Sequence, residues 1–557
     1  MSDSGTAQSW ESRPEPSGSG GQQDPPGGDR YPVDRVVFGV GALVVLAVVG
    51  WGAFASGSLE SASATGLAWV LHNFGWLFVT AADVFLVLCP VLAFSRYGRI
   101  RLGADDDEAE FSNLAWIAMM FSAGMGIGLM FYGVGEPLQH YAAPAPGSGV
   151  SPLSPAAAQS ALVFSLFHWT LTPWGMYAVA GLALAYTTFR KGRGNRISSV
   201  FVSLLGEDRA AGWPGRLIDL LAVFATVFGS ATSLGLGALQ VARGLGVVAG
   251  VKDTQAVQLI IIAALTGAFV VSAFSGVHRG IKWLSTTNVV LAAVIMVFVL
   301  VVGPTVFVLD AIPSSLGGYL SGLLTLSTRT GAFTDESWLG TWTIFYWAWW
   351  LSWAPFVGTF IARISRGRTV RQFLFGVLLV PSGGTALWFC VMGGSAIRLD
   401  ATGTSSLVRK AVDQGAEEAL FGLLKALPLG SVSTVVAALL VMTYFITSAD
   451  SASLVLGSLS QGGALHPRTW LVVTWGVLMG AVAAVLLVAG GLAALQQATI
   501  LVALPFVLVM LALCWALIRD LRTDPAVQAL SGHGHPQGLT AAVRAAVGEA
   551  LASRPRD

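Results

Sequence analysis

The chain has 557 residues, of which 54% are hydrophobic and 11% are charged, and its mean hydropathy is +0.70. So much apolar surface cannot be buried in one soluble core, so this composition predicts a polytopic membrane protein. The net charge of +1 argues against nucleic acid as a partner, and three widely separated cysteines predict neither a disulfide framework nor a zinc site.

Apolar stretches of about 20 residues or more, separated by Pro-, Gly- and Arg-rich breaks, predict an all-α integral membrane protein with twelve transmembrane helices. Residues 1–32 are rich in Gly, Ser, Pro and Gln and predict a disordered cytoplasmic tail rather than a signal peptide. Lysine and arginine are concentrated in the loops that would face the cytoplasm, which places both termini inside. The predicted spans are centred near residues 45, 80, 125, 170, 232, 265, 297, 350, 383, 445, 478 and 506.

The third span, FSAGMGIGLMFYGVGEP, is interrupted by Gly124, Gly126, Gly128, Gly133 and Gly135. Glycine weakens a helix and frees carbonyls, which hydrocarbon tolerates only where the backbone lines a cavity or is buried in protein. The pattern therefore predicts a broken helix of the kind that secondary transporters use to hold ions and substrate. The alternative is a close packing seam, since Gly124 and Gly128 also form a GxxxG pair.

The fourth span contains FHWTLTPWGMY, in which Trp169, Trp174 and Tyr177 surround a proline. Because proline bends a helix, Pro173 can direct these rings toward a cavity. His168 is predicted to be an internal hydrogen-bonding residue rather than a ligand.

Two spans carry hydroxyl groups that suit a small hard cation. In the fifth span Thr226 and Ser230 share one face, and in the tenth Thr447 and Ser448 can approach the carbonyl of Tyr444. Sodium accepts such oxygen ligands, although each pair taken alone is also compatible with ordinary back-bonding within a helix. The carbonyls freed in the third span that complete this shell are those of Ser122 and Met125.

Other features are predicted to be structural. Glu136 and Asp450 lie next to the two ion segments, and a buried charge there requires partners or water. Ile312 to Leu326 is too short and too rich in Ser and Gly to span a bilayer, so an interfacial helix is predicted.

The eighth span, WTIFYWAWWLSWAPF, is the most informative segment. Helical spacing places Tyr346, Trp349, Trp350 and Trp353 on one face, beside Pro355. Indole faces attract a quaternary ammonium because the ring quadrupole requires no hydrogen-bond donor. A binding site is therefore favoured over an interfacial belt or a packing surface.

The strings GMGIGLMFYGVGEP, HWTLTPWGMY, FYWAWWLSWAPFVGTFIARISRGRT and TSADS together closely resemble the betaine/carnitine/choline transporter family, over about residues 33–519. The resemblance implies a homotrimer and a core of five plus five helices in an inverted repeat of the sodium-symporter type. The implied divisions are residues 33–108 for two peripheral helices, 109–311 for the first repeat, 312–337 for an interfacial linker, 338–519 for the second repeat and 520–557 for a cytoplasmic tail.

The resemblance also implies a substrate site and two sodium sites. The substrate residues are Trp349, Trp350, Trp353, Trp169, Trp174, Tyr177, Met125 and Ala123. One sodium would be held by the carbonyls of Ser122, Met125 and Tyr444 and the hydroxyls of Thr447 and Ser448. The second would be held by Thr226, Ser230 and the ring of Phe356.

Within this resemblance, the residue at position 128 favours one coupling ion over another. Proton-coupled choline carriers of the family tend to have an acidic residue there, so glycine favours sodium and a zwitterion such as glycine betaine, ectoine or proline. The prediction is a sodium-coupled symporter of the plasma membrane that needs no other cofactor. A sodium-independent exchanger of the carnitine type, a proton-coupled choline carrier and a ligand-gated channel are the alternatives. A membrane-embedded enzyme is disfavoured because HExxH, GxSxG and paired intramembrane carboxylates are missing.

Overall fold

The computed structural model describes residues 31–124, 126–275, 278–413 and 415–530. Within these residues the chain is helical and forms no strand beyond one isolated bridge between Arg101 and Thr369. In the same part of the chain, nine helices are long and apolar enough to cross a membrane. The prediction of an all-helical integral membrane protein is confirmed, whereas twelve crossings and the inverted repeat stay predictions.

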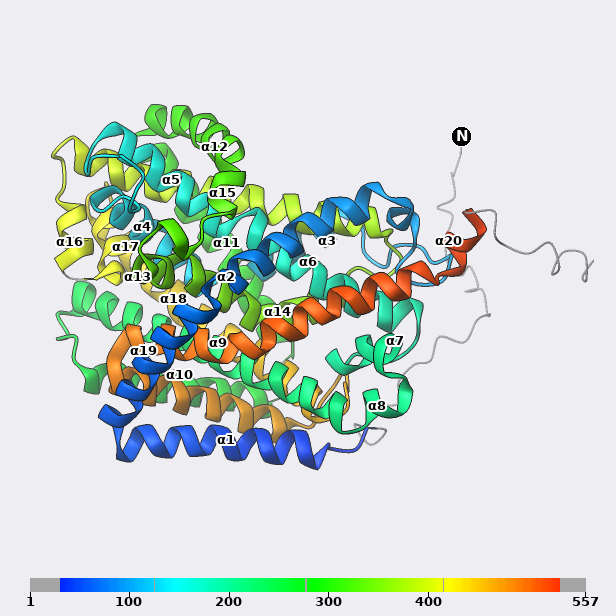
Figure 1. Ribbon diagram of the computed structural model, residues 1–557. Helices are drawn as coiled ribbons and strands as arrows, with labels where there is room; N and C mark the ends of the chain where they lie inside the picture. The colour runs from blue at the N-terminus through cyan, green and yellow to red at the C-terminus, as the bar shows by residue number, and fades with distance from the viewer. Residues whose placement is uncertain (1–30, 125, 276–277, 414, 531–557) are drawn as a thin grey trace, which may run out of the picture.

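The elements follow one another along the chain (Figure 1). The first half contains α1 Arg35–Phe54, α2 Ser56–Phe94, η1 Arg96–Arg99, α3 Asn113–Gly124, α4 Ile127–Ala142, α5 Pro155–Trp169, α6 Leu171–Ala185, η2 Tyr186–Arg190, η3 Ile197–Phe201, α7 Val202–Leu205, α8 Glu207–Ala211, α9 Trp213–Ala249, α10 Gln255–Ser275 and α11 His278–Val302. The second half contains α12 Thr305–Ser327, η4 Gly331–Phe333, α13 Glu336–Leu339, η5 Gly340–Ile344, α14 Phe345–Arg363, α15 Val370–Ala401, α16 Leu407–Asp413, α17 Ala416–Lys425, α18 Gly430–Ser460, α19 Thr469–Arg522 and α20 Pro525–Leu530.

Each predicted span centre falls within one of these helices or at a break between two of them. The predicted eleventh and twelfth spans both lie in α19, where Gly490 and Gly491 leave the helical conformation. Gly491 has φ 61° and ψ −139°, a region that side chains with a Cβ avoid, so glycine permits the kink there. The predicted boundary between the second repeat and the C-terminal tail lies inside α19, because this helix continues to Arg522.

The prediction of a short interfacial helix is wrong in its length. The helix α12 begins at Thr305, directly after Pro304, and runs for 23 residues. It is apolar enough to count among the candidate spans of the described chain, because the preceding residues Val306 to Leu309 continue the same helix. Proline is well tolerated at the start of a helix, and here Pro304 marks the boundary that the sequence interpretation overlooked.

The helices differ in how far they are enclosed. Most of the apolar window of α9 is buried, whereas α1, α10 and α11 leave most of theirs uncovered, as expected for helices that face lipid. The helix α19 packs against α9 and α2, and α14 packs against α6 and α9. In Figure 1, the short helices α7, α8 and α20 lie at one end of the molecule and α16 and α17 lie at the other.

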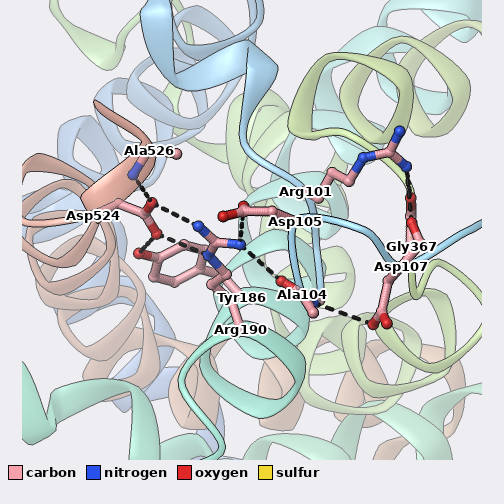
Figure 2. A network of polar contacts seen from close by, with 10 residues as sticks. Arg101, Ala104, Asp105, Asp107, Tyr186, Arg190, Gly367, Asp524 and Ala526 are labelled. Atoms are coloured by element: carbon pink, nitrogen blue, oxygen red, sulfur yellow. Dashed lines mark hydrogen bonds and ion pairs between the residues drawn. The ribbon is translucent and has the colours of Figure 1, made fainter. Parts of the chain in front are cut away.

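A polar network holds the C-terminal end of α19 and the start of α20 (Figure 2). The Arg190 guanidinium donates to both carboxylate oxygens of Asp524 at 3.1 and 3.0 Å and also to Asp105. The Tyr186 hydroxyl donates to the same aspartate at 2.7 Å. Burial raises the pKa of Asp524, but the hydrogen bonds from Arg190 and Tyr186 outweigh it and hold the pKa below its ordinary value. The Arg190–Asp524 ion pair therefore joins η2, α20 and the loop before α3.

Candidate functional site

The predicted discontinuity in the third span is present. The helix α3 ends at Gly124 and α4 begins at Ile127, with Gly126 in an extended conformation of φ −161° and ψ −172° between them. The backbone at the start of α4 therefore has amide groups without partners inside its own helix, as at every helix start. Met125, and the side chains of Ser122 and Ala123, lie outside the described residues, so their predicted roles stay predictions.

The fourth span is broken as well, and more sharply than the predicted bend. The helix α5 ends at Trp169, Thr170 has φ −114° and ψ −115°, and α6 begins at the next residue. Pro173 is four residues after Trp169, so its ring would clash with the Trp169 carbonyl in a continuous helix and it has no N–H to donate. The chain avoids that clash by leaving the helical conformation at Thr170, and Trp169 and Trp174 then line the same cavity.

These two breaks and α14 enclose one cavity that contains all six aromatic side chains predicted for the substrate site. Its volume is about 490 Å³, including the open space at its mouth. The lining residues are Gly126, Gly128, Leu129, Trp169, Pro173, Trp174, Tyr177, Trp349, Trp350, Trp353 and Thr385.

Trp349 and Trp350 stack on each other, with centroids 5.4 Å apart and planes inclined by 19°, and the other rings of the cavity meet this wall or one another at steep angles. The centroids of Trp169 and Trp350 are 4.9 Å apart and their planes are inclined by 83°. Tyr177 meets Trp350 at 6.0 Å and 88°, and Trp174 meets Tyr177 at 5.4 Å and 79°. Most of these side chains are buried, while Trp350 is half-buried at the cavity. The structure thus brings these aromatics to one cavity, while their role in substrate binding stays a prediction.

The indole N–H groups of α14 are directed away from a ligand and into the protein. Trp350 donates to the carbonyl of His168 at 3.0 Å. Trp349 and Trp353 both donate to the carbonyl of Gly229, at 3.3 and 3.2 Å. Since these donors are already paired, the rings offer their π faces, which suit a cation that has no hydrogen-bond donors.

The cavity lining also includes the polar side chains of Tyr177 and Thr385 and the backbone of Gly126 and Gly128. Among the described residues, the buried hydroxyl of Tyr177 has no hydrogen-bond partner. Gly128 lies against two rings, since a Cβ there would be 2.7 Å from Cη2 of Trp349 and 2.9 Å from Cη2 of Trp169. Only glycine therefore allows the start of α4 to approach the box this closely.

A buried carboxylate, Glu136, lies beside the box. Its Oε2 accepts hydrogen bonds from Trp169 Nε1 at 2.7 Å and from the Tyr346 hydroxyl at 2.6 Å. Its Oε1 lies 2.7 Å from Nδ1 of His168 and 3.4 Å from Nε2 of His140. His168 also contacts the Thr343 hydroxyl at 3.1 Å, so the prediction that it is an internal hydrogen-bonding residue is confirmed.

Glu136, His140 and His168 also form the one group in the described chain whose ligand atoms could hold a metal ion, all lying within 4.8 Å of one another. Two ligands of a tetrahedral zinc ion are about 3.3 Å apart, given bonds of about 2.0 Å. The 2.7 Å between His168 and Glu136 is a hydrogen-bond distance instead. The geometry therefore favours a hydrogen-bonded cluster over a metal site.

The hydroxyl segment of the tenth span, in α18, has acceptors close together. Thr447 Oγ1 lies 3.2 Å from the Tyr444 carbonyl and 3.0 Å from that of Thr443, which is back-bonding within the helix. The buried Asn288 of α11 contacts the same hydroxyl at 3.4 Å, and Ser448 is half-buried next to it. Hydroxyl and carbonyl therefore converge as predicted, while sodium binding there stays a prediction.

This part of α18 is close to the break in the third span. A Cβ on Gly237 of α9 would lie 3.0 Å from Ile127 and 3.3 Å from Phe445. The first residue of α4 and the residue after Tyr444 therefore meet at the same point on α9.

The second predicted sodium set lies where α9 packs on α14. Thr226 is buried and its hydroxyl bonds the Ala222 carbonyl at 2.8 Å, while Ser230 is 5% exposed. The rings of Trp353 and Phe356 are 5.6 Å apart on the facing helix. Thr226 and Ser230 lie on α9 and Phe356 lies on α14, which packs against it, and their role as ligands stays a prediction.

Three polar residues near these sites were missed by the sequence interpretation. They are Asn288, Thr385 of the cavity wall, and Gln240, which donates to the Met130 carbonyl at 2.9 Å. Each is a single polar side chain in an apolar run, which is a weak but available signal.

Comparison with known proteins agrees with this site. The family model described as BCCT, betaine/carnitine/choline family transporter, matches residues 36–526. The glycine betaine transporter OpuD of Bacillus subtilis is 45% identical over 490 residues, which cover 88% of this chain and 94% of that protein. The betaine/ectoine transporter LcoP of Corynebacterium glutamicum is 44% identical over 509 residues, covering 89% and 79%. Glycine betaine transporter 1 of Vibrio parahaemolyticus is 41% identical over 508 residues, covering 89% and 95%. The chain is therefore a multi-pass membrane transporter, not an enzyme, and it belongs to the betaine/carnitine/choline transporter family.

Proposed function

We propose that the protein imports a quaternary-ammonium or related zwitterionic solute together with sodium by alternating access. Glycine betaine is the first candidate, and ectoine or proline are the next. The observation that carries the proposal is the cavity whose walls are indole faces, with the N–H groups of Trp349, Trp350 and Trp353 bonded into the protein. The similarity to OpuD, a glycine betaine transporter, and to LcoP, a betaine/ectoine transporter, supports the same class of solute.

A zwitterion matches both ends of this cavity. Its ammonium would lie against the rings of Trp349, Trp350 and Trp353, because a methylated cation gains from π faces without needing an acceptor. Its carboxylate would face the start of α4 at Gly126 and Gly128, where helix amides lack partners and the helix dipole is positive. A cation without a carboxylate would leave that end of the site unmatched.

Sodium would act by linking the broken third span to α18. An ion held between the carbonyls of α3 and the oxygens of Tyr444 and Thr447 would stabilise the state in which the start of α4 faces the rings. Coupling is then a difference in solute affinity with and without the ion. Both termini in the cytoplasm and assembly as a homotrimer in the plasma membrane belong to the same proposal.

The test is uptake of labelled glycine betaine into proteoliposomes that contain the purified protein, with and without an inward sodium gradient. We expect concentrative uptake that requires sodium and that unlabelled ectoine or proline reduces if they share the site. Uptake that ignores sodium but requires solute inside the vesicle would establish an exchanger instead. Uptake driven by a proton gradient, with choline preferred, would establish a choline carrier.

The aromatic box is tested by Trp350→Leu. Leucine keeps apolar volume but removes the π face, and a desolvated cation–π contact is worth about 2 kcal/mol, or about 30-fold in affinity. The apparent KM for uptake should therefore rise about 30-fold, which leaves little uptake at solute concentrations near the KM of the unmodified protein. Trp515→Leu is the matched control, because Trp515 is 69% exposed on the outer surface of α19. Equal apparent affinity in both variants would mean that the box is only packing.

A further inference from the structure

Glu136 is the most completely bonded carboxylate beside the aromatic box. It is 0% exposed. Four side chains from three helical segments surround it, namely His140 of α4, His168 and Trp169 of α5, and Tyr346 of α14. Two of these four side chains are histidines, which lie 3.4 and 2.7 Å from the carboxylate. The carboxylate therefore connects both broken spans with the tryptophan-rich helix.

The bond to Trp169 is the one that bears on the ligand. An indole N–H can only donate, so the partner of Trp169 must be an acceptor. A hydrogen bond to an ionised acceptor is shorter and about twice as strong as a neutral one, and the 2.7 Å here is at that short limit. Trp169 stands at 83° to Trp350 and at 90° to Trp349, so a turn of this ring would change the shape of the cavity.

The bond to Tyr346 acts on the other side of the box. The Tyr346 ring lies behind the stacked indoles, 6.4 Å from Trp349 and 6.5 Å from Trp350, with small interplanar angles of 30° and 15°. It is fully buried and does not line the cavity. Its hydroxyl is held at 2.6 Å by the same carboxylate oxygen that holds Trp169. Oε2 of Glu136 therefore fixes the position of Trp169, which is one wall of the box, relative to Tyr346, which supports the other.

We propose that Glu136 is a positioning residue of the substrate site, which holds Trp169 and Tyr346 at the angles that the ammonium group requires. The negative charge of Glu136 also strengthens the attraction between the Trp169 ring and the ammonium group. An N–H donor that is bonded to an anion is polarised, and the electron density of its ring rises. A ring with more electron density attracts a cation more strongly. This inference rests on the proposed binding of an ammonium solute and names the residue that orients its site.

The first measurement is the affinity of purified Glu136→Gln protein for glycine betaine by calorimetry, with transport kinetics in proteoliposomes. Glutamine can keep an oxygen toward Trp169, but its bonds are neutral, so the dissociation constant should rise about tenfold. KM should rise in parallel while the rate at saturation changes little, whereas a purely structural defect would lower the active fraction and the rate. An unchanged dissociation constant would overturn the inference.

The matched control is Asp219→Asn. Asp219 is also a buried carboxylate, 1% exposed, and it accepts hydrogen bonds from Ser198 at 2.9 and 2.8 Å, away from the box. We expect its dissociation constant for glycine betaine to stay within about twofold of the unmodified protein. An effect as large as that of Glu136→Gln would mean that loss of any buried carboxylate weakens binding, which would overturn the inference.

A double-mutant cycle decides whether the effect passes through Trp169. Trp169→Phe removes the indole N–H, so Glu136→Gln in that background should change the dissociation constant by less than about threefold. A full tenfold effect in the phenylalanine background would refute the route through Trp169. If Glu136→Gln does not fold, Tyr346→Phe is measured instead, because it removes a hydroxyl that donates to Glu136. Its dissociation constant for glycine betaine should rise about threefold, and an unchanged constant would contradict the inference.

The two levels of proposal fail separately. If the unmodified protein binds choline or carnitine but not glycine betaine, the proposed substrate is wrong, yet Glu136→Gln measured with the bound ammonium compound still tests the positioning role. If the unmodified protein binds glycine betaine and Glu136→Gln binds it equally well, only the positioning role is wrong.

Discussion

Replacing Gly128 with alanine tests whether the backbone of the broken third span must approach the aromatic rings. The added Cβ would be 2.7 Å from Cη2 of Trp349 and 2.9 Å from Cη2 of Trp169. Carbon atoms pack at about 3.5 Å or more, so one or both rings must move by about 0.7 Å. Neither ring is free to do so, because both are anchored through their N–H groups, to Gly229 and to Glu136.

Helix propensity and overpacking have opposite effects on the stability of the Gly128→Ala protein, but only overpacking affects binding. Alanine in place of glycine favours a helix by up to about 1 kcal/mol, whereas overpacking costs about 1–3 kcal/mol. The net change in the free energy of unfolding should therefore be small. Binding gains nothing from helix propensity and loses the ring geometry, so the dissociation constant for glycine betaine should rise by about 5- to 100-fold.

Calorimetric titration and proteoliposome uptake measure this effect, with thermal unfolding as the check on folding. Gly267→Ala is the control, because Gly267 lies in α10 and a Cβ there meets nothing within 4 Å. Its affinity and uptake should match those of the unmodified protein. A Gly128→Ala protein that binds glycine betaine with unchanged affinity would refute the argument that this close approach shapes the site.

The remaining predictions concern the ion segment and the C-terminal network. Thr447→Ala should raise the sodium concentration for half-maximal uptake, because it removes the hydroxyl next to the Tyr444 carbonyl. Thr474→Ala is the control: its hydroxyl bonds the Trp470 carbonyl of the same helix, so its loss should leave this sodium concentration unchanged. Asp524→Asn should weaken the bonds from Arg190 and speed protease cleavage near the end of α19, and equal cleavage rates would contradict the role of the network. The lowered pKa of Asp524 means that its stabilisation is complete above the ordinary aspartate pKa of about 3.9 and is lost as the pH falls through the lower folded value. Cleavage by a protease active in acid should therefore stay slow above about pH 4 and increase only below it.

Local patterns predicted much of the fold and of the site. The apolar stretches predicted the helices, because a bilayer requires continuous apolar runs. The glycines at 124, 126 and 128 predicted the break between α3 and α4, because glycine weakens a helix whatever surrounds it. Helical spacing alone placed Trp349, Trp350 and Trp353 near one face.

Other predictions failed or remained incomplete where the surroundings of a segment decide its structure. The helix α12 is longer than predicted because its first turn is apolar and follows a proline. The prediction of a short helix rested on the serines and glycines farther along the same segment. The break in the fourth span was predicted as a bend at Pro173, whereas the chain leaves the helix at Thr170, where the proline ring would otherwise clash.

The amino-acid sequence by itself determined most of the helical stretches, the break at the glycines of the third span and which aromatic side chains are available, since these depend on composition and on neighbours a few residues away. Only the tertiary structure decided that Gly128 lies between two indoles, that Asn288 reaches Thr447, and that Glu136 joins Trp169 to Tyr346. These contacts link residues up to 221 positions apart along the chain, the separation between Gly128 and Trp349. Such contacts depend on how the helices pack against one another, and no spacing within a single helix encodes that packing.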